Sequence, residues 1–215
     1  MKVSVGDRMK STFTYGSSFM NFLENITNVL LLNFWMLLTA LPLITIPAAL
    51  MGANATMARV LANQEAHVTR DYFRFFRQNL KQGLKLGVFT AAAAAVIAFD
   101  LRYLDKLPIT LHLLLGNTLL VIAVATAILL SLLPSYLSRY EETIPHALRN
   151  LFIIFLHHAG WSLLMVLVTI WPLFLLQAGA IGVWTLVYWF SFVGFGVCAW
   201  LQTLIFRHIV SLIEA

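Results

Sequence analysis

Runs of apolar residues, each about as long as a bilayer is thick, dominate the sequence. A helix rises about 1.5 Å per residue, so roughly 20 apolar residues cross the hydrocarbon core of a membrane. Prolines, glycines and short charged groups stand between the runs and end helices or form loops. The pattern predicts an all-α protein, a polytopic helical membrane bundle that forms a single integral membrane domain over residues 1–215. The runs cover residues 26–41, 47–63, 87–104, 111–133, 161–176 and 181–206.

The segments between these runs predict helices and turns at the membrane surface. Residues 1–25 mix aromatic and polar side chains and are expected to form an interfacial or cytoplasmic N-terminal segment. Residues 143–158 begin with Thr143, a candidate N-cap, and predict a second surface helix. Pro134 is expected to close the run before it, and Gln177–Gly179 predicts a turn between the last two runs.

The first two runs meet at a proline-bounded segment with two interpretations. Pro42 ends the first run, and Pro47 suits the first turn of a new helix, where its missing N–H does no harm. Small residues around Gly52 permit close helix contacts. Residues 26–63 therefore form either one kinked span or a tight hairpin of two short spans that turns at Pro42–Pro47.

Residues 69–85 predict a basic amphipathic helix. Basic residues recur there at intervals of three or four, which places them in one stripe along a helix. Aromatic residues occupy the opposite side. Such a helix contacts anionic lipid headgroups or docks on a partner protein. The residues assigned to lipid or partner docking are Arg70, Arg74, Arg77, Lys81, Lys85, Tyr72, Phe73 and Phe76.

Composition supports a membrane protein. Apolar residues make up 60% of the chain and charged residues 11%, against about 45–50% and 25% in soluble domains. The net charge of +5 does not indicate nucleic-acid binding, because the basic residues gather beside apolar runs, as in cytoplasmic loops.

The distribution of basic residues favours six membrane segments over five. With six segments and both termini in the cytoplasm, twelve of the 14 basic residues lie inside and only Arg102 and Lys106 lie outside. With five segments and an external N-terminus, only nine lie inside. The twelve are Lys2, Arg8, Lys10, Arg59, Arg70, Arg74, Arg77, Lys81, Lys85, Arg139, Arg149 and Arg207.

Motifs that carry chemistry are missing from the sequence. It has no phosphate-binding loop, no zinc-protease helix motif and no grouping of nucleophile and base. We therefore expect no enzyme activity, no cofactor and no metal. The intramembrane polar residues either bond between helices or line a polar path. They are Asn28, Asn33, Asn54 and Asn117.

The segment from Asn28 to about Gly83 resembles the YesL-like family of bacterial integral membrane proteins. The resemblance is carried by residues 33–35 (NFW), 41–49 (LPLITIPAA) and 71–82 (DYFRFFRQNLKQ). It implies a multi-pass protein of the bacterial cytoplasmic (plasma) membrane. Family members are often encoded beside sugar-binding proteins, carbohydrate ABC permeases and glycan-degrading enzymes.

This association implies a function in carbohydrate transport. We expect a non-enzymatic accessory protein or regulator of an oligosaccharide ABC importer, because the sequence lacks the coupling motif of a permease. The expected partners are the lipid bilayer and permease or ATPase subunits, with no nucleic acid. One alternative is a small solute transporter or channel that acts as a homo-oligomer, and another is a membrane-organising protein with no solute.

Overall fold

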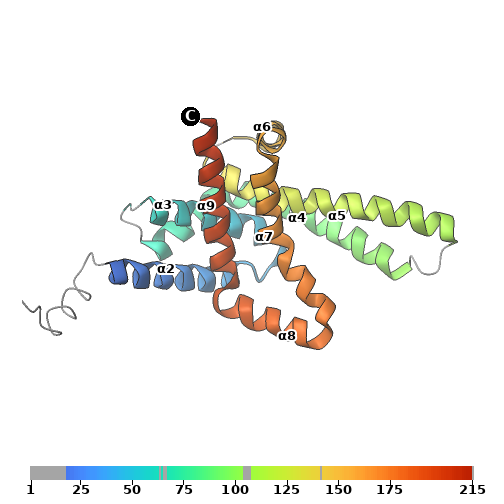
Figure 1. Ribbon diagram of the computed structural model, residues 1–215, viewed down its shortest axis with the longest axis horizontal. Coiled ribbons are helices and arrows are strands. Elements are labelled where there is room, and N and C mark those ends of the chain that lie inside the picture. Colours follow the sequence, from blue (N-terminus) through green and yellow to red (C-terminus); the bar gives the residue numbers. More distant parts are fainter. Residues whose placement is uncertain (1–17, 63, 65–66, 104–107, 141, 215) are drawn as a thin grey trace, which may run out of the picture.

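The computed structural model describes residues 18–214 except 63, 65–66, 104–107 and 141. All elements in this part are helical (Figure 1), so the predicted all-α class is confirmed. Of the predicted N-terminal segment 1–25, residues 1–17 lie outside the described residues, and residues 18–25 belong to α2. The elements are α2 (Ser18–Thr39), η1 (Leu43–Thr45), α3 (Ile46–Leu61), α4 (Val68–Tyr103), α5 (Ile109–Leu137), α6 (Ile144–His157), α7 (Ala159–Leu175), η3 (Leu176–Ala178), α8 (Gly179–Trp189), the π-helical η4 (Phe190–Gly194) and α9 (Phe195–Ile213).

The first two runs form two helices that pack against each other, as the hairpin interpretation predicts. Pro42 precedes η1 in an extended conformation, which takes the chain out of the direction of α2. Pro47 lies in the first turn of α3, where a helix has no use for its N–H. The Thr45 hydroxyl donates to the Thr39 carbonyl over 2.5 Å and closes the turn.

Helix α3 is the most enclosed element of the described structure. It packs against α2, α4, α5 and α9, and most of its side chains are buried, Asn54 and Thr56 included. These polar residues make the segment unsuited to lipid, and here neighbouring helices shield them. The small residues of α3 allow this close packing: Gly52 lies against the Phe76 backbone of α4, where a Cβ would approach to 3.2 Å.

The basic segment and the third apolar run form one helix. The sequence indicated a surface helix, a short break and then a span, but α4 continues from Val68 to Tyr103 without interruption. Two glycines near the boundary between the basic segment and the apolar run, Gly83 and Gly87, face the start of α3 and η1. Helix α5 likewise continues past Pro134, the expected end, to Leu137. Figure 1 shows α4 and α5 side by side as a long hairpin.

The C-terminal part adds a second group of helices. Helix α6 occupies the position of the predicted second surface helix, with Thr143 at its N-cap. The turn predicted at Gln177–Gly179 appears as η3, and Gly179 has the positive φ of 61° that favours glycine. The predicted single run 181–206 is divided into α8 and α9 by η4. In Figure 1, α7 and α9 run across the direction of α2, α4 and α5.

Two hydrophobic clusters hold the helices together. One surrounds Leu133 and Met165 and joins α5, α6, α7 and α9 with Met51 of α3 and Leu86 of α4. The other surrounds Leu32 and Met57 and joins α2, α3 and the start of α4. Because α3 contributes side chains to both clusters, it connects the two parts of the bundle.

Four stretches of the described chain are long and apolar enough to cross a membrane: Leu43–Leu61, Val68–Phe99, Leu114–Leu137 and Ala159–Ile213. The last covers α7, α8 and α9. Large apolar side chains on α5 and α8 are exposed, among them Val121 at 67% and Ile181 at 78%, as expected for surfaces that lipid covers. The predicted count of six segments is not confirmed.

Candidate functional site

The first half of α4 has one basic side and one aromatic side. The structure places Arg70, Arg77, Lys81 and Lys85 at the surface, where they are exposed. Arg74 is also exposed but pairs with an acid, described below. The aromatic residues face the protein: Tyr72 is fully buried, and Phe73 and Phe76 are partly buried. The side chains assigned to docking are thus divided between a free basic surface and a packed interior.

The aromatic side fixes α4 against α2. The Trp35 indole N–H donates to the Thr69 hydroxyl over 3.0 Å, and the Trp35 ring meets Phe73 edge to face at 4.9 Å between centroids. Tyr72 and Thr39 join through their hydroxyl groups. Aromatic contacts of this kind add to the area that they bury, so Tyr72 and Phe73 serve to position the helix rather than to meet a partner.

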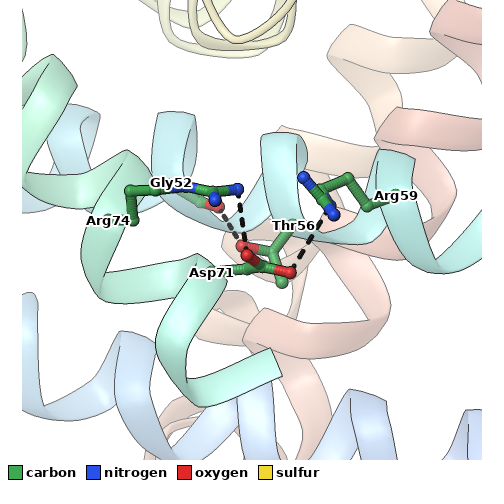
Figure 2. Close-up of polar contacts among 5 residues, drawn as sticks. All are labelled: Gly52, Thr56, Arg59, Asp71 and Arg74. Carbon is green, nitrogen blue, oxygen red and sulfur yellow. Dashed lines mark hydrogen bonds and ion pairs between the residues drawn. The ribbon is translucent and has the colours of Figure 1, made fainter. Parts of the chain in front are cut away.

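Asp71 is a buried acid between two arginines from different helices (Figure 2). Only 4% of Asp71 is exposed. Its Oδ1 atom lies 2.9 Å from the Arg74 guanidinium on the same helix, and its Oδ2 atom lies 3.4 Å from Arg59 Nε in the last turn of α3. The second contact is an ion pair without hydrogen-bond geometry. In the sequence Asp71 stands in the first turn of the predicted helix, where an acid suits the helix dipole, and nothing there links it to Arg59.

Replacing Asp71 with asparagine is expected to lower the free energy of unfolding by about 2 kcal/mol, since two arginines lose their counter-charge. Unfolding can be measured by SDS titration in mixed micelles with circular dichroism. Glu214→Gln is the matched control, because Glu214 pairs with Arg139 over 3.3 Å and both side chains are well exposed. That pair should contribute less than about 1 kcal/mol. Equal losses in the two variants would contradict a special role for Asp71.

Asn54 links four helices through buried hydrogen bonds. Its Nδ2 group donates to Ser135 Oγ of α5 over 3.0 Å and to Gln202 Oε1 of α9 over 3.4 Å. Gln202 Nε2 then donates to Thr169 Oγ1 of α7 over 3.0 Å. The predicted interhelical role of Asn54 therefore has defined partners. Its Oδ1 atom is buried and has no hydrogen-bond partner in the described structure.

Asn33 holds α2 against the π-helical segment. Its Nδ2 group donates to the carbonyls of Phe190 and Ser191 over 3.1 and 3.2 Å, and its Oδ1 atom accepts from the Gly196 N–H over 3.1 Å. One side chain thus satisfies three backbone groups where the helix departs from α-geometry. Buried backbone groups need such partners, above all in a membrane.

The other two asparagines do not join these contacts in the same way. Asn28 is half-buried on α2, and Asn117 is exposed on α5. The four asparagines are therefore not equivalent, and sequence reasoning could not rank them. Among the described residues, no group of three or more histidine, cysteine, aspartate or glutamate side chains could hold a metal ion.

The segments that carry the family resemblance lie together on α2, on η1 with α3, and on the first half of α4. Residues 28–101 match a family model described as Protein of unknown function, DUF624. YesL-like proteins belong to this family, so the resemblance is supported over the matched residues. The match covers about a third of the chain. The chain matches no curated protein and no solved structure.

The DUF624 match covers consecutive elements of the fold: more than half of α2, the proline turn, α3 and nearly all of α4. It includes Asn33, Asn54, Asp71 and the basic side of α4. Helices α5 to α9, which supply the partners of both asparagines, lie outside it. The features described above are therefore completed by residues beyond the matched segment.

Proposed function

We propose that the protein is a non-enzymatic accessory or regulatory subunit of the bacterial cytoplasmic membrane, associated with an ABC importer of oligosaccharides. The basic side of α4 is its docking surface, and the partner offers acidic side chains, on the permease or on its ATPase. The basic residues Arg70, Arg77, Lys81 and Lys85 make this surface.

One observation carries the docking proposal. These four side chains are exposed, and none has an ion-pair partner among the described residues. The opposite side of the same helix is fixed by Tyr72, Phe73 and Phe76. A rigid helix that presents unpaired charge suits electrostatic recognition, in which complementary charge sets orientation and speeds association. The same charges also favour anionic headgroups, by about 1 kcal/mol each.

The proposed topology has six membrane segments with both termini in the cytoplasm. The positive-inside distribution supports it. So does the length of the stretch Ala159–Ile213, which at 55 residues exceeds twice the roughly 20 residues of one crossing. In this arrangement the basic side of α4 faces the cytoplasm, where the ATPase of an importer is found.

The docking proposal predicts that loss of charge on α4 releases the partner. In Arg77→Gln/Lys81→Gln, recovery of importer subunits with the tagged protein from native membranes should fall about tenfold or more, as measured by quantitative mass spectrometry after mild crosslinking. Arg74 is left intact because it pairs with Asp71. The control Arg102→Gln/Arg149→Gln removes the same charge from other exposed positions and should recover wild-type amounts.

Two results would count against this function. Recovery of no importer subunit with the wild-type protein would remove the accessory role itself. Equal recovery with both double variants would leave the accessory role and remove α4 as its docking surface. If Arg77→Gln/Lys81→Gln lost binding to anionic vesicles but recovered importer subunits as the wild type does, the basic side of α4 would be assigned to lipid.

A second candidate, a small transporter or channel that works as a homo-oligomer, is favoured by one observation. Polar side chains of four helices meet at Asn54. In addition, the hydroxyls of Ser131 on α5 and Ser162 on α7 are buried without a hydrogen-bond partner in the described structure. Purified protein in liposomes would move an oligosaccharide by itself in this case, whereas an accessory subunit would not.

A further inference from the structure

A basic pocket of about 290 Å³ lies between α3, α5 and α9. Its lining includes three arginines: Arg59 in the last turn of α3, Arg139 just beyond α5, and Arg207 on α9. Charge counting along the sequence put these arginines on the same side of the membrane. It gave no indication that they share one cavity, because they are far apart in the chain.

Each arginine keeps donors available to a ligand. A guanidinium has five N–H groups. Arg207 donates through NH1 to the Leu61 carbonyl over 2.8 Å, Arg139 contacts Glu214 over 3.3 Å at an exposed position, and Arg59 contacts Asp71 through Nε. The described part of the pocket lining contains three arginines and no aspartate or glutamate. Asp71 and Glu214, which contact Arg59 and Arg139 from outside the lining, offset two of the three positive charges and leave an excess.

Polar groups form a second layer one helical turn before the arginines. Thr203 precedes Arg207 by four residues and Ser135 precedes Arg139 by four, and both line the pocket. For Thr203 and Arg207, both on α9, this spacing corresponds to about 6 Å along the helix.

Asn54 lines the same cavity and precedes Arg59 by five residues. It is 1% exposed, and its Oδ1 atom has no hydrogen-bond partner in the described structure. Its Nδ2 group is already engaged by Ser135 and Gln202. A buried amide oxygen of this kind requires a donor.

The geometry points to a binding site for a phosphorylated polyol, with the phosphate among the three arginines and a hydroxyl group toward Asn54. Arginine forks match phosphate oxygens and form strong, charge-assisted hydrogen bonds. A carboxylate offers only two oxygens, whereas a phosphate ester offers three to the guanidinium N–H groups that Asp71, Glu214 and the Leu61 carbonyl leave free. The hydroxyl of inorganic phosphate sits on the phosphorus that the arginines would hold. A polyol ester carries its hydroxyls further out, toward Oδ1 of Asn54, which precedes Arg59 by five residues or about 7.5 Å along α3.

This chemistry has two sources, the headgroup of phosphatidylglycerol and a free polyol phosphate. At about 290 Å³ the pocket lies at the small end of the range for small-molecule sites, which suits a headgroup or a small sugar phosphate. The site is separate from the basic side of α4 and does not depend on the proposed docking function.

Two probes test the site with the whole protein. Glycerol 3-phosphate binding is measured by calorimetry in phosphatidylcholine nanodiscs, and retention of phosphatidylglycerol is measured by native mass spectrometry from an uncharged detergent. The double variant Arg139→Gln/Arg207→Gln should bind about 100-fold more weakly, at roughly tenfold per arginine. The control Arg102→Gln/Arg149→Gln, outside the pocket, should bind as the wild type does.

The outcomes separate the two sources. Binding of both probes, or of glycerol 3-phosphate alone, supports a site open to a soluble ligand, and retention of phosphatidylglycerol alone supports a headgroup site. If the arginine variant does not fold, Ala58→Leu decides, because Ala58 lines the pocket and leucine fills it without a change of charge. Binding that is unchanged in a folded arginine variant or in Ala58→Leu, or absent from the wild type, overturns the proposal.

Discussion

Replacing Gly87 with alanine is expected to lower the free energy of unfolding by about 3 kcal/mol. A Cβ at this position would overlap the Ile44 carbonyl oxygen and lie 2.7 Å from the carbonyl carbon. Because these are backbone atoms, no side chain can turn aside, and α4 must separate from η1. Gly83 stands one turn away, where a Cβ would lie 2.5 Å from Ala48 Cα, so the separation would also loosen α3. Forced overpacking of this kind costs about 1–3 kcal/mol and occasionally more.

The matched control is the same substitution at Gly116 of α5. A Cβ there meets nothing within 4 Å, so Gly116→Ala should raise stability by up to about 1 kcal/mol through helix propensity. SDS titration in mixed micelles, followed by circular dichroism, measures both. The two substitutions are expected to change the free energy of unfolding in opposite directions. A Gly87→Ala protein as stable as the wild type would contradict a close backbone contact between α4 and η1.

Asn33→Leu is the second large effect, with an expected loss of about 2–4 kcal/mol. The leucine would leave the carbonyls of Phe190 and Ser191 without their bonds from Asn33 and the Gly196 N–H without its acceptor. A buried group that loses its partner costs about 1–3 kcal/mol. Part of this is recovered because the π-helical segment can relax toward α-geometry.

Asn117→Leu provides the comparison, since Asn117 is exposed on α5 and its loss should change stability by less than about 0.5 kcal/mol. Hydrogen exchange adds a local measurement. In Asn33→Leu, the amide of Gly196 should exchange faster than in the wild type, while amides in α5 should not change. Similar stabilities for the two leucine variants would contradict the role of Asn33 as the hydrogen-bond partner of the η4 and α9 backbone.

The helices were predictable because an apolar run in a membrane must satisfy its own backbone. The run 47–63 predicted α3 (Ile46–Leu61), and the segment 143–158 predicted α6 (Ile144–His157). Their start signals, Pro47 and the N-cap residue Thr143, act locally, so the sequence alone reveals them. The basic and aromatic sides of α4 followed from helical periodicity for the same reason.

Features that depend on contacts between distant segments could not be predicted. The continuity of α4 is one example, because residues 69–85 and 87–104 differ in polarity and only the structure shows that Gly83 and Gly87 between them contact Ala48 and Ile44. Asp71 lies in the first turn of α4, as its position in the sequence indicates, but its contact with Arg59 depends on how α3 packs against α4. The basic pocket is a further example, since its arginines share only a charge and not a local motif.

Helix α4 has a mechanical consequence that follows from its continuity and its contacts. Its 36 residues form a rod of about 54 Å, and the glycines that press against Ile44 and Ala48 lie close to its midpoint. The arginine-bearing half before these glycines is held by α2 and α3, and the half beyond them runs beside α5. Because no break separates the two halves, a shift of α3 against α4 would also displace the half that runs beside α5.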